Sequence, residues 1–139
     1  MPRAQLAALP FALKEGRSQV LLVTSRETRR WVIPKGWPKK KVEPHVQAAR
    51  EAYEEAGIVG SVDTRPIGSY RYEKRLKSGK TTTCKVDVYL LEVEQELDEW
   101  PEKGERERRW MSPAEAADLV TEDSLTDILL RLANGLPLS

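Results

Sequence analysis

The sequence has one cysteine, Cys84, among its 139 residues. A lone cysteine forms neither an intramolecular disulfide nor a cysteine-based zinc site, so disulfide frameworks and zinc fingers are excluded. Such cysteine usage fits a reducing compartment. The only histidine, His45, follows a proline at an expected helix start, and we expect it at the surface rather than on a metal.

Long apolar runs and a strong net charge are also missing. No stretch approaches the roughly 20 apolar residues that span a bilayer, and Gln5 and Pro10 interrupt the first apolar segment, unlike a secretory signal. The net charge of +1 gives no general attraction to nucleic acid or an anionic membrane. We expect one domain over residues 1–139 and a cytoplasmic protein without a membrane partner.

Apolar periodicity predicts a sheet. In the longest expected strand, Cys84, Val86 and Val88 alternate with Lys85 and Asp87 at period two. A polar turn containing glycine over residues 77–80 makes this strand the second half of a hairpin. The expected strands are 3–14, 19–24, 31–33, 61–65, 67–76, 81–93 and 106–111, with a turn over 16–18.

Residues typical of helix termini predict three helices. Pro44 suits the first helical turn and Gly57 the position after the last, so a helix is expected between them. Ser112 and Glu115 form a capping box that opens a second helix, and Ser124 opens a third. Strands followed by helices in this order predict an α/β fold, a mixed sheet with helices on its faces.

The first helix has three acids on one face. Glu51, Glu54 and Glu55 are spaced i, i+3 and i+4, and like charges at this spacing cost roughly 0.2–0.5 kcal/mol per pair. Their convergence becomes favourable when a hard cation such as Mg²⁺ lies between them. The alternative is a solvated acidic face. The apolar stripe that we expect to pack on the core consists of Val46, Ala49, Tyr53 and Ala56.

These acids belong to a recognisable pattern. Its residues are Gly36, Arg50, Glu51, Glu54, Glu55, Gly57 and Ile58. The spacing resembles the Nudix hydrolase signature G-x5-E-x7-R-E-U-x-E-E-x-G-U, where U is aliphatic. Val42 stands where the first glutamate is expected, with Glu43 one residue late, and Ala52 is small for its U position. The resemblance implies the Nudix α/β/α sandwich with a mixed sheet.

The resemblance also implies roles for individual residues. A Mg²⁺ (or Mn²⁺) site is expected from Gly36, Glu51, Glu54 and Glu55. The expected catalytic residues are Arg50, which orients a catalytic glutamate by a salt bridge, Glu54, and the general base Glu105. Glu102 and Glu107 are alternatives to Glu105 as the base. The implied reaction is metal-dependent hydrolysis of a diphosphate linked to another moiety.

Basic residues near the acids suggest a polyphosphorylated small molecule as substrate. The residues expected to bind it are Arg30, Lys35, Lys39, Lys41 and Arg71. The sequence from Trp31 to Gly36 and the basic hairpin resemble the diphosphoinositol and diadenosine polyphosphate phosphohydrolase branch. A solvated basic face is the alternative. Of the four tryptophans, Trp37 follows the glycine and is a candidate to stack on a base.

Several functions fit this pattern. The substrate classes are dinucleoside polyphosphates, inositol pyrophosphates, nucleoside triphosphates and RNA 5′ ends. A second class of function is a binding module that senses a nucleotide without turnover, which Val42 keeps open and the intact Arg50-Glu51 and Glu54-Glu55 pairs argue against. An RNA-binding protein that uses the basic hairpin is disfavoured, because the hairpin lacks aromatic residues interleaved in a clear stacking pattern.

Overall fold

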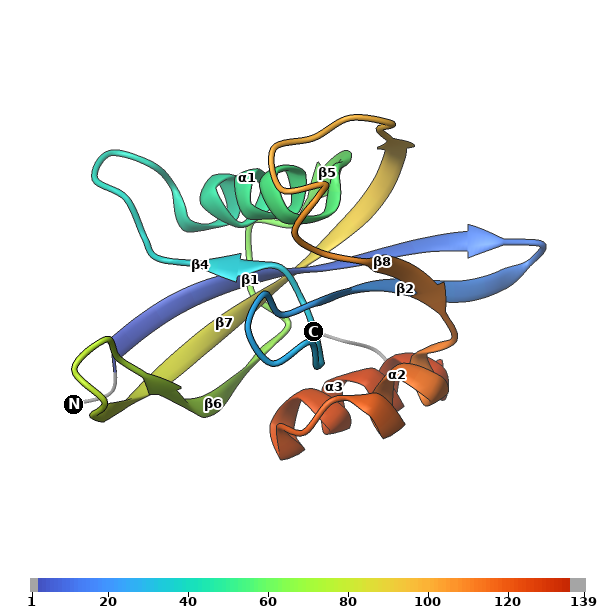
Figure 1. The fold of residues 1–139 in the computed structure, drawn as a ribbon. Coiled ribbons are helices and arrows are strands. Elements are labelled where there is room, and N and C mark those ends of the chain that lie inside the picture. The colour runs from blue at the N-terminus through green and yellow to red at the C-terminus, as the bar shows by residue number, and fades with distance from the viewer. Residues whose placement is uncertain (1–2, 136–139) are drawn as a thin grey trace.

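The computed structural model describes residues 3–135, which form one mixed sheet between helices (Figure 1). The strands are β1 (Arg3–Lys14), β2 (Arg17–Thr24), β3 (Trp31–Val32), β4 (Lys35–Gly36), β5 (Ile58–Val62), β6 (Gly68–Arg75), β7 (Thr81–Glu96) and β8 (Arg108–Met111). The helices are α1 (Pro44–Ala56), α2 (Pro113–Leu119) and α3 (Asp123–Ala133). In Figure 1, α1 covers one face of the sheet and α2 and α3 cover the other. The predicted α/β sandwich with a mixed sheet is confirmed.

The sheet is built on β1 and β7, which pair in parallel from Arg3 opposite Cys84 to Phe11 opposite Glu92. The other pairings are antiparallel. Each central strand changes its outer partner along its length: β1 pairs first with β4 and then with β2, and β7 first with β6 and then with β5. As a result β4 and β6 lie at the same end of the sheet, which holds the site described below.

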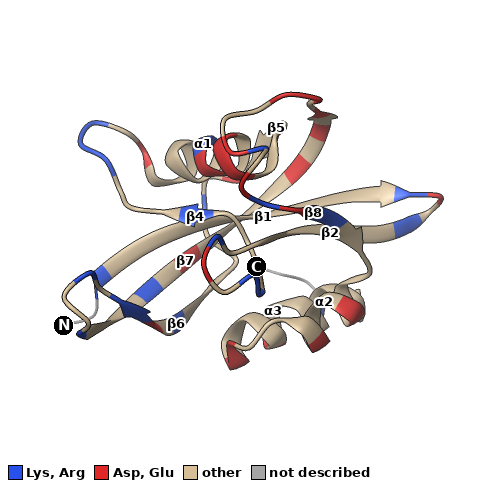
Figure 2. Ribbon diagram, viewed as in Figure 1, with Lys and Arg blue, Asp and Glu red and all other residues tan. Residues whose placement is uncertain are grey.

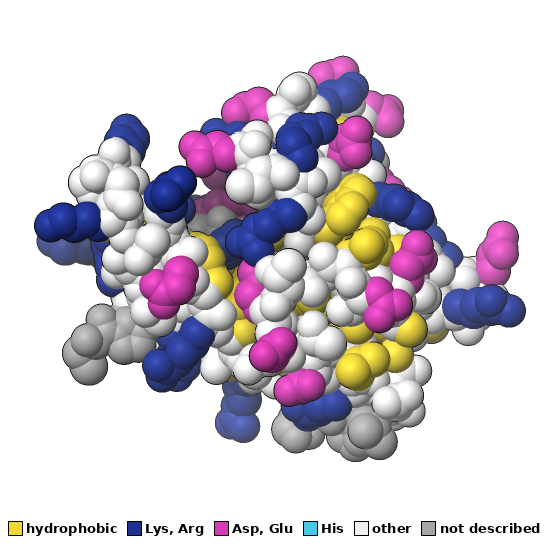
Figure 3. Space-filling view, turned by 60° about the horizontal axis from the view of Figure 1, so that its bottom comes forward, with side chains coloured by type: hydrophobic (Ala, Val, Ile, Leu, Met, Phe, Trp, Pro, Cys, Tyr) yellow, Lys and Arg dark blue, Asp and Glu magenta, His cyan; other side chains and the backbone are white. Residues whose placement is uncertain are grey.

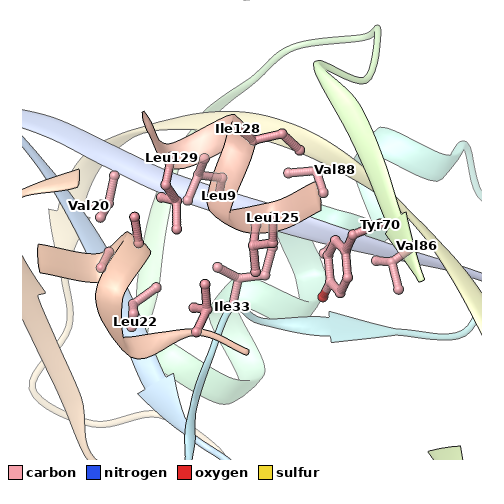
Figure 4. Close-up of a cluster of buried hydrophobic side chains, with 14 of the residues drawn as sticks. Leu9, Val20, Leu22, Ile33, Tyr70, Val86, Val88, Leu125, Ile128 and Leu129 are labelled. Atoms are coloured by element: carbon pink, nitrogen blue, oxygen red, sulfur yellow. The ribbon is translucent and has the colours of Figure 1, made fainter. Parts of the chain in front are cut away.

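Alternation along β1 supplies both hydrophobic clusters. Ala7 and Leu9 face the layer of α2 and α3, whereas Leu6 and Ala8 face α1, and all four side chains are buried. Figure 4 shows the first cluster, in which Leu9 lies among side chains of β2, β7 and α3. Because residues i and i+2 of a strand share a face, one strand links both halves of the core.

Helix α1 packs on the sheet through small residues. Ala48, Ala52 and Ala56 are fully buried, whereas Val46 and Tyr53 are 38% and 42% exposed. The predicted docking stripe was therefore wrong for Val46 and Tyr53. Alanine lets a helix approach a sheet closely, and the polar side chains that flank these alanines on the helix are drawn into the interior with them. Because the alanine face of α1 points to the sheet, Glu51 and Glu55 beside it are buried, whereas Glu54 is half-buried.

Local signals were correct at several element ends, but the strand expected over 61–65 is β5 at Ile58–Val62, and the third helix begins at Asp123. Ser112 accepts a hydrogen bond from the Glu115 N–H at 3.1 Å, as the capping box predicts. The turn expected over 16–18 is shorter, because β2 already begins at Arg17 and the left-handed residues are Glu15 and Gly16. The short strand β4 was not predicted, since pairing with β1 alone defines it.

Charged residues are unevenly distributed over this frame (Figure 2). Lys and Arg mark the loop between β4 and α1 and the strand β6, whereas Asp and Glu concentrate on α1 and on the segment after β7. In the space-filling view, basic side chains stand out at the end of the molecule that holds this loop and β6 (Figure 3). Within residues 3–135, no helix combines the length and the apolar character needed to cross a membrane.

Candidate functional site

Five of the eleven expected site residues line one pocket of about 360 Å³, here called the central pocket: Lys35, Gly36, Lys39, Glu51 and Glu55. It is bounded by β4, α1, β6 and the segment between β7 and β8, called the 97–107 loop. Its cationic residues are Arg26, Lys35, Lys39, Lys74 and Arg106. Its acidic residues are Glu51, Glu55 and Glu102. Gln5, Gly36, Trp37 and Tyr72 complete the lining.

Glu51 is held in place by two neighbours. A Cβ at Gly36 would lie 2.3 Å from the Glu51 carboxyl carbon, so only glycine lets this carboxylate approach the β4 backbone so closely. Gln47 Nε2 donates a hydrogen bond of 2.7 Å to Glu51 Oε2. Gln47 is fully buried, and its Oε1 has no hydrogen-bond partner. Burial raises the pKa of Glu51 above its usual value.

Glu55, one turn further along α1, is only 6% exposed. Burial raises the pKa of this carboxyl to about 8; the positive charges of Arg106 and Lys35 oppose the rise, and Glu51 adds to it. Its ion pair with Arg106 is long, with 3.9 Å between Nη2 and Oε1. The site therefore holds a buried carboxyl whose negative charge is incompletely compensated.

This donor set fits a hard divalent cation. Glu51 and Glu55 offer carboxylate oxygens at the wall of an open pocket, and Mg²⁺ prefers oxygen ligands and retains several waters. Among residues 3–135, no three metal-binding side chains converge as they are placed. Glu54, the third expected ligand, is half-buried and does not line the central pocket. The two buried carboxylates of α1, of which Glu51 lies against Gly36, are thus the donors that the geometry offers.

Arg50 does not orient a glutamate in this structure. Its side chain is exposed, it is absent from the lining of the central pocket, and no ion pair of the described residues includes it. Arg106 is the arginine that faces the acids. Its Nε donates to Glu102 Oε1 at 2.8 Å, its Nη1 donates to the Thr24 carbonyl at 3.1 Å, and its side chain is 10% exposed. Arg106 was not predicted from the sequence, because the motif spacing points to Arg50.

The 97–107 loop is fastened to the end of α1. Arg108 donates to a carbonyl at the C-terminal end of α1 at 2.9 Å, and its guanidinium lies 4.0 Å from the centre of the Trp100 ring. Trp100 packs on Gly57, where a Cβ would come within 2.4 Å of the indole. The Glu102 N–H donates to the Glu54 carbonyl at 3.0 Å. These contacts place the Glu102 side chain in the wall of the central pocket.

The acid expected as general base lies elsewhere. The Glu105 side chain is 50% exposed, pairs with Arg26 at 3.2 Å and does not line the central pocket. Glu107 is 67% exposed and lies 3.7 Å from Arg29. Glu102 is the only one of the three candidate acids in the lining. Residue spacing does not distinguish the three acids, because loop geometry decides which acid faces inward, and the identity of the base stays a prediction.

Two of the five expected substrate-binding residues line the central pocket. Lys39 is exposed at its mouth, and the Lys35 ammonium lies 5.0 Å from the centre of the Tyr72 ring. Burial lowers the pKa of Lys35. The structure adds Arg26 and Lys74 to the lining. In the sequence, Arg26 belongs to an arginine-rich turn and Lys74 to the basic hairpin, and these two features could have pointed to them.

The other three expected substrate-binding residues lie outside the central pocket. Arg30 donates to Thr121 Oγ1 at 2.7 Å and pairs with Glu122 at 3.4 Å, which ties it to the segment between α2 and α3. Lys41 and Arg71 are exposed. The expected role of these three residues in substrate binding stays a prediction.

Known proteins resemble this chain along most of its length. The NUDIX domain model matches residues 3–130. Nudix hydrolase 13, mitochondrial, of Arabidopsis thaliana is 36% identical over 110 residues, which cover 76% of this chain and 54% of that protein. Diphosphoinositol polyphosphate phosphohydrolase 2 of Rattus norvegicus is 31% identical over 116 residues, or 82% of this chain and 60% of that protein. The chain spans about half the length of the first two curated relatives, 54% and 51%.

Solved structures share the fold. The crystal structure of the C. elegans Ap4A hydrolase matches with a TM-score of 0.65 and 19% identity, covering 97% of this chain and 98% of that one. The NUDIX domain of Shewanella oneidensis NrtR, complexed with ADP ribose, matches with a TM-score of 0.69 and 12% identity, covering 99% and 90%. At sequence identities of 19% and 12%, this similarity shows a shared fold and nothing further.

Proposed function

This chain belongs to the Nudix hydrolase family, and on that premise we propose that it hydrolyses a phosphoanhydride bond of a diphosphate linked to another moiety. One observation supports this most directly: two buried glutamates of α1 and five cationic side chains line the same pocket. A diphosphate needs cations for its oxygens, and the carboxylates suit a metal that bridges enzyme and phosphate.

Glu51 and Glu55 would hold a Mg²⁺ or Mn²⁺ ion beside Gly36, and Glu54 stays a predicted further ligand. When bound, such an ion supplies neutralisation of the diphosphate charge and a bound water of lowered pKa. The raised pKa of Glu55 supports this assignment, because a buried carboxyl with incomplete compensation gains most from a nearby cation.

The remaining roles follow from contacts of the chain itself. Gln47 fixes the Glu51 carboxylate, and Arg106 links Glu55 to Glu102 across the pocket. We assign Glu102, in place of Glu105, as the general base that accepts the proton of the attacking water. The water oxygen then bonds to phosphorus while a phosphate leaves, and Lys35 and Lys39 offset the charge of the phosphate oxygens.

The proposed substrate is polyphosphorylated, such as a dinucleoside polyphosphate or an inositol pyrophosphate. The five cations around three acids support a substrate with several phosphates, as do the names of a rat diphosphoinositol polyphosphate phosphohydrolase and a nematode Ap4A hydrolase among the similar proteins. Nucleoside triphosphates and RNA 5′ ends are alternative substrates. A nucleotide sensor without turnover is the alternative function.

A phosphate-release screen with Mg²⁺ over these substrates tests the proposal. Glu51→Gln and Glu55→Gln should lose most turnover, because each removes an anionic metal ligand while preserving shape. Glu94→Gln, at an exposed position of β7, is the matched control. A wild-type chain that binds a nucleotide but cleaves none of the substrates would establish the sensor. Gln variants as active as the wild type would refute the ligand assignment.

The cytoplasmic location and the absence of membrane or general nucleic-acid partners stay predictions. The names of several relatives from Arabidopsis thaliana include the word mitochondrial. Imaging of a chain tagged at its C-terminus, with markers for both compartments, distinguishes the two locations.

A further inference from the structure

Gln5 is a buried amide in the wall of the central pocket. It lies on β1, and only 5% of its surface is exposed. Residues i and i+2 of a strand share a face, so Gln5 faces the same layer as Ala7 and Leu9, whose side chains belong to the hydrophobic core. A buried amide costs free energy unless it is hydrogen-bonded. An apolar residue would serve the core better, so the partners of Gln5 indicate what its amide does.

Tyr72 holds one end of this amide. Its hydroxyl donates a hydrogen bond of 2.5 Å to Gln5 Oε1. The two side chains meet across β7, because β6 and β1 lie on opposite sides of that strand. Burial raises the pKa of Tyr72, so the hydroxyl keeps the proton that it donates. Gln5 Oε1 is therefore occupied, and the orientation of the amide is fixed.

The other end of the amide is free to bind a ligand. Among residues 3–135, the Tyr72 hydroxyl is the one hydrogen-bond partner of the Gln5 side chain. The amide nitrogen Nε2 carries two N–H donors, and Gln5 lines the central pocket. A buried donor without a partner costs free energy, and a ligand oxygen in the pocket would remove that cost. The Gln5–Tyr72 pair therefore has the arrangement of a binding group with its support.

The charges around this pair favour an anionic ligand. The Lys35 ammonium lies 5.0 Å from the centre of the Tyr72 ring. Lys74 is two residues further along β6 than Tyr72 and lines the same pocket. The acids of the pocket come from α1 and the 97–107 loop, whereas Gln5, Lys35 and Lys74 come from β1, β4 and β6. The strand side of the pocket therefore combines one neutral donor with two cations, a set that suits phosphoryl oxygens.

We propose that Gln5 Nε2 donates a hydrogen bond to a phosphoryl oxygen of the substrate, and that Tyr72 is the positioning residue for this contact. The Tyr72 hydroxyl orients the amide, and its ring keeps Lys35 beside the same phosphate. The inference rests on the proposed hydrolysis of a polyphosphorylated substrate and names a contact for it that carries no charge. Neither residue belongs to the segment from Gly36 to Ile58, so the motif could not have indicated them.

The probe that tests this contact is inorganic tripolyphosphate with Mg²⁺, because it offers phosphoryl oxygens and no other group. Its affinity is measured as KM where the wild type hydrolyses it and as a calorimetric Kd where the wild type does not. Gln5→Leu should raise this value roughly 10- to 150-fold, which corresponds to about 1.5–3 kcal/mol for a hydrogen bond to a charged group. The kcat should change less than KM, because the contact is already made in the bound substrate.

Tyr72→Phe separates positioning from packing. It keeps the ring beside Lys35 and removes only the hydroxyl that orients Gln5, so KM or Kd should rise about fivefold. The double variant Gln5→Leu/Tyr72→Phe should bind no more weakly than Gln5→Leu, because the hydroxyl acts through the amide. The effect of Tyr72→Phe should be the same at low and high salt, since the hydroxyl carries no charge to be screened.

Tyr70→Phe is the matched control. It removes a phenolic hydroxyl two residues earlier on β6, from a buried side chain that does not line the central pocket (Figure 4), and its affinity should match that of the wild type. A Tyr72→Phe variant with wild-type affinity and a lower free energy of unfolding would show that the hydrogen bond serves the fold alone, which overturns the proposal. A wild type that binds no tripolyphosphate overturns it as well. If the screen finds no hydrolysis while Kd still follows Gln5 and Tyr72, the proposed function fails and the contact stands.

Discussion

Gln47 Nε2 donates a 2.7 Å hydrogen bond to the Glu51 carboxylate, one turn further along α1, and both side chains are buried. A fully buried amide is costly unless it is hydrogen-bonded, and here only one of its two polar atoms has a partner. The same carboxylate is pressed against Gly36. Glu51 is therefore fixed from the helix side and from the strand side.

Gln47→Leu should preserve the fold and impair the site. Leucine fills similar volume and removes the unpaired buried oxygen, but it also leaves the buried Glu51 carboxylate without its donor, so the free energy of unfolding should fall by about 1–3 kcal/mol. Hydrogen bonds to charged groups are worth about 1.5–3 kcal/mol, and we expect kcat to fall about tenfold or more, with a higher Mg²⁺ concentration for half-maximal rate. Calorimetric Mn²⁺ binding gives a readout independent of turnover. Unchanged Mn²⁺ affinity and kcat would show that Gln47 does not position Glu51.

Glu102→Gln and Glu105→Gln separate the two candidate bases. Loss of a general base typically costs about 10²–10⁴-fold in rate. We expect that loss in kcat for Glu102→Gln, because Glu102 lines the central pocket, and little change for the exposed Glu105. The pH–rate profile should lose its acidic limb only in Glu102→Gln. The reverse ranking would return the base to Glu105.

The raised pKa of Glu55 makes stability depend on pH. Its ordinary pKa is 4.5, and in the folded chain it is about 8. Between these values the folded state binds more protons than the unfolded state, so the free energy of unfolding should fall as pH rises from 4.5 to 8. Denaturant unfolding of metal-free protein should show this slope, and Glu55→Gln should flatten it. Mg²⁺ at pH 8 should stabilise wild type more than Glu55→Gln; equal slopes in the two proteins would contradict the shift.

Lys39→Glu and Lys41→Glu form a matched pair of charge reversals in one loop. Only Lys39 lines the central pocket. We expect Lys39→Glu to raise KM, and to raise it more for longer polyphosphates, because more phosphate charge lies near the substituted residue. Lys41→Glu should have a small effect that is similar for all lengths and is screened by salt. Similar KM increases for both variants would indicate a general attraction by the basic loop.

Gly57→Ala tests how the 97–107 loop is attached. Gly57 and Gly16 both have positive φ, 66° and 77°, so alanine at either position costs roughly 1–2 kcal/mol of backbone strain. A Cβ meets nothing within 4 Å at Gly16, but lies 2.4 Å from Trp100 at Gly57. Gly57→Ala should therefore be the more destabilising by urea unfolding and should also reduce kcat through displacement of Glu102. Equal losses would mean that Trp100 gives way freely.

The features predicted correctly from the sequence are those set by residues that lie close together in it. The capping box at Ser112 and the hairpin of β6 and β7 depend on residues a few positions apart. The prediction was wrong about the face that α1 buries, since Val46 and Tyr53 are exposed. Hydrophobicity favoured the larger residues, whereas close approach of helix and sheet favours the alanines. The orientation of a helix is settled by the surface against which it packs.

The sequence by itself determined the family, the α/β architecture and the stretch from Gly36 to Gly57 that supplies the acids, because these follow from residue spacing along one segment. Only the tertiary structure decided which charges meet. Arg106 and Glu102 reach the central pocket from the 97–107 loop, because packing of Trp100 and Arg108 on the end of α1 fixes that loop. Arg50, on α1 itself, is exposed. Long-range packing, which no spacing rule encodes, thus chose the cationic partner of Glu55.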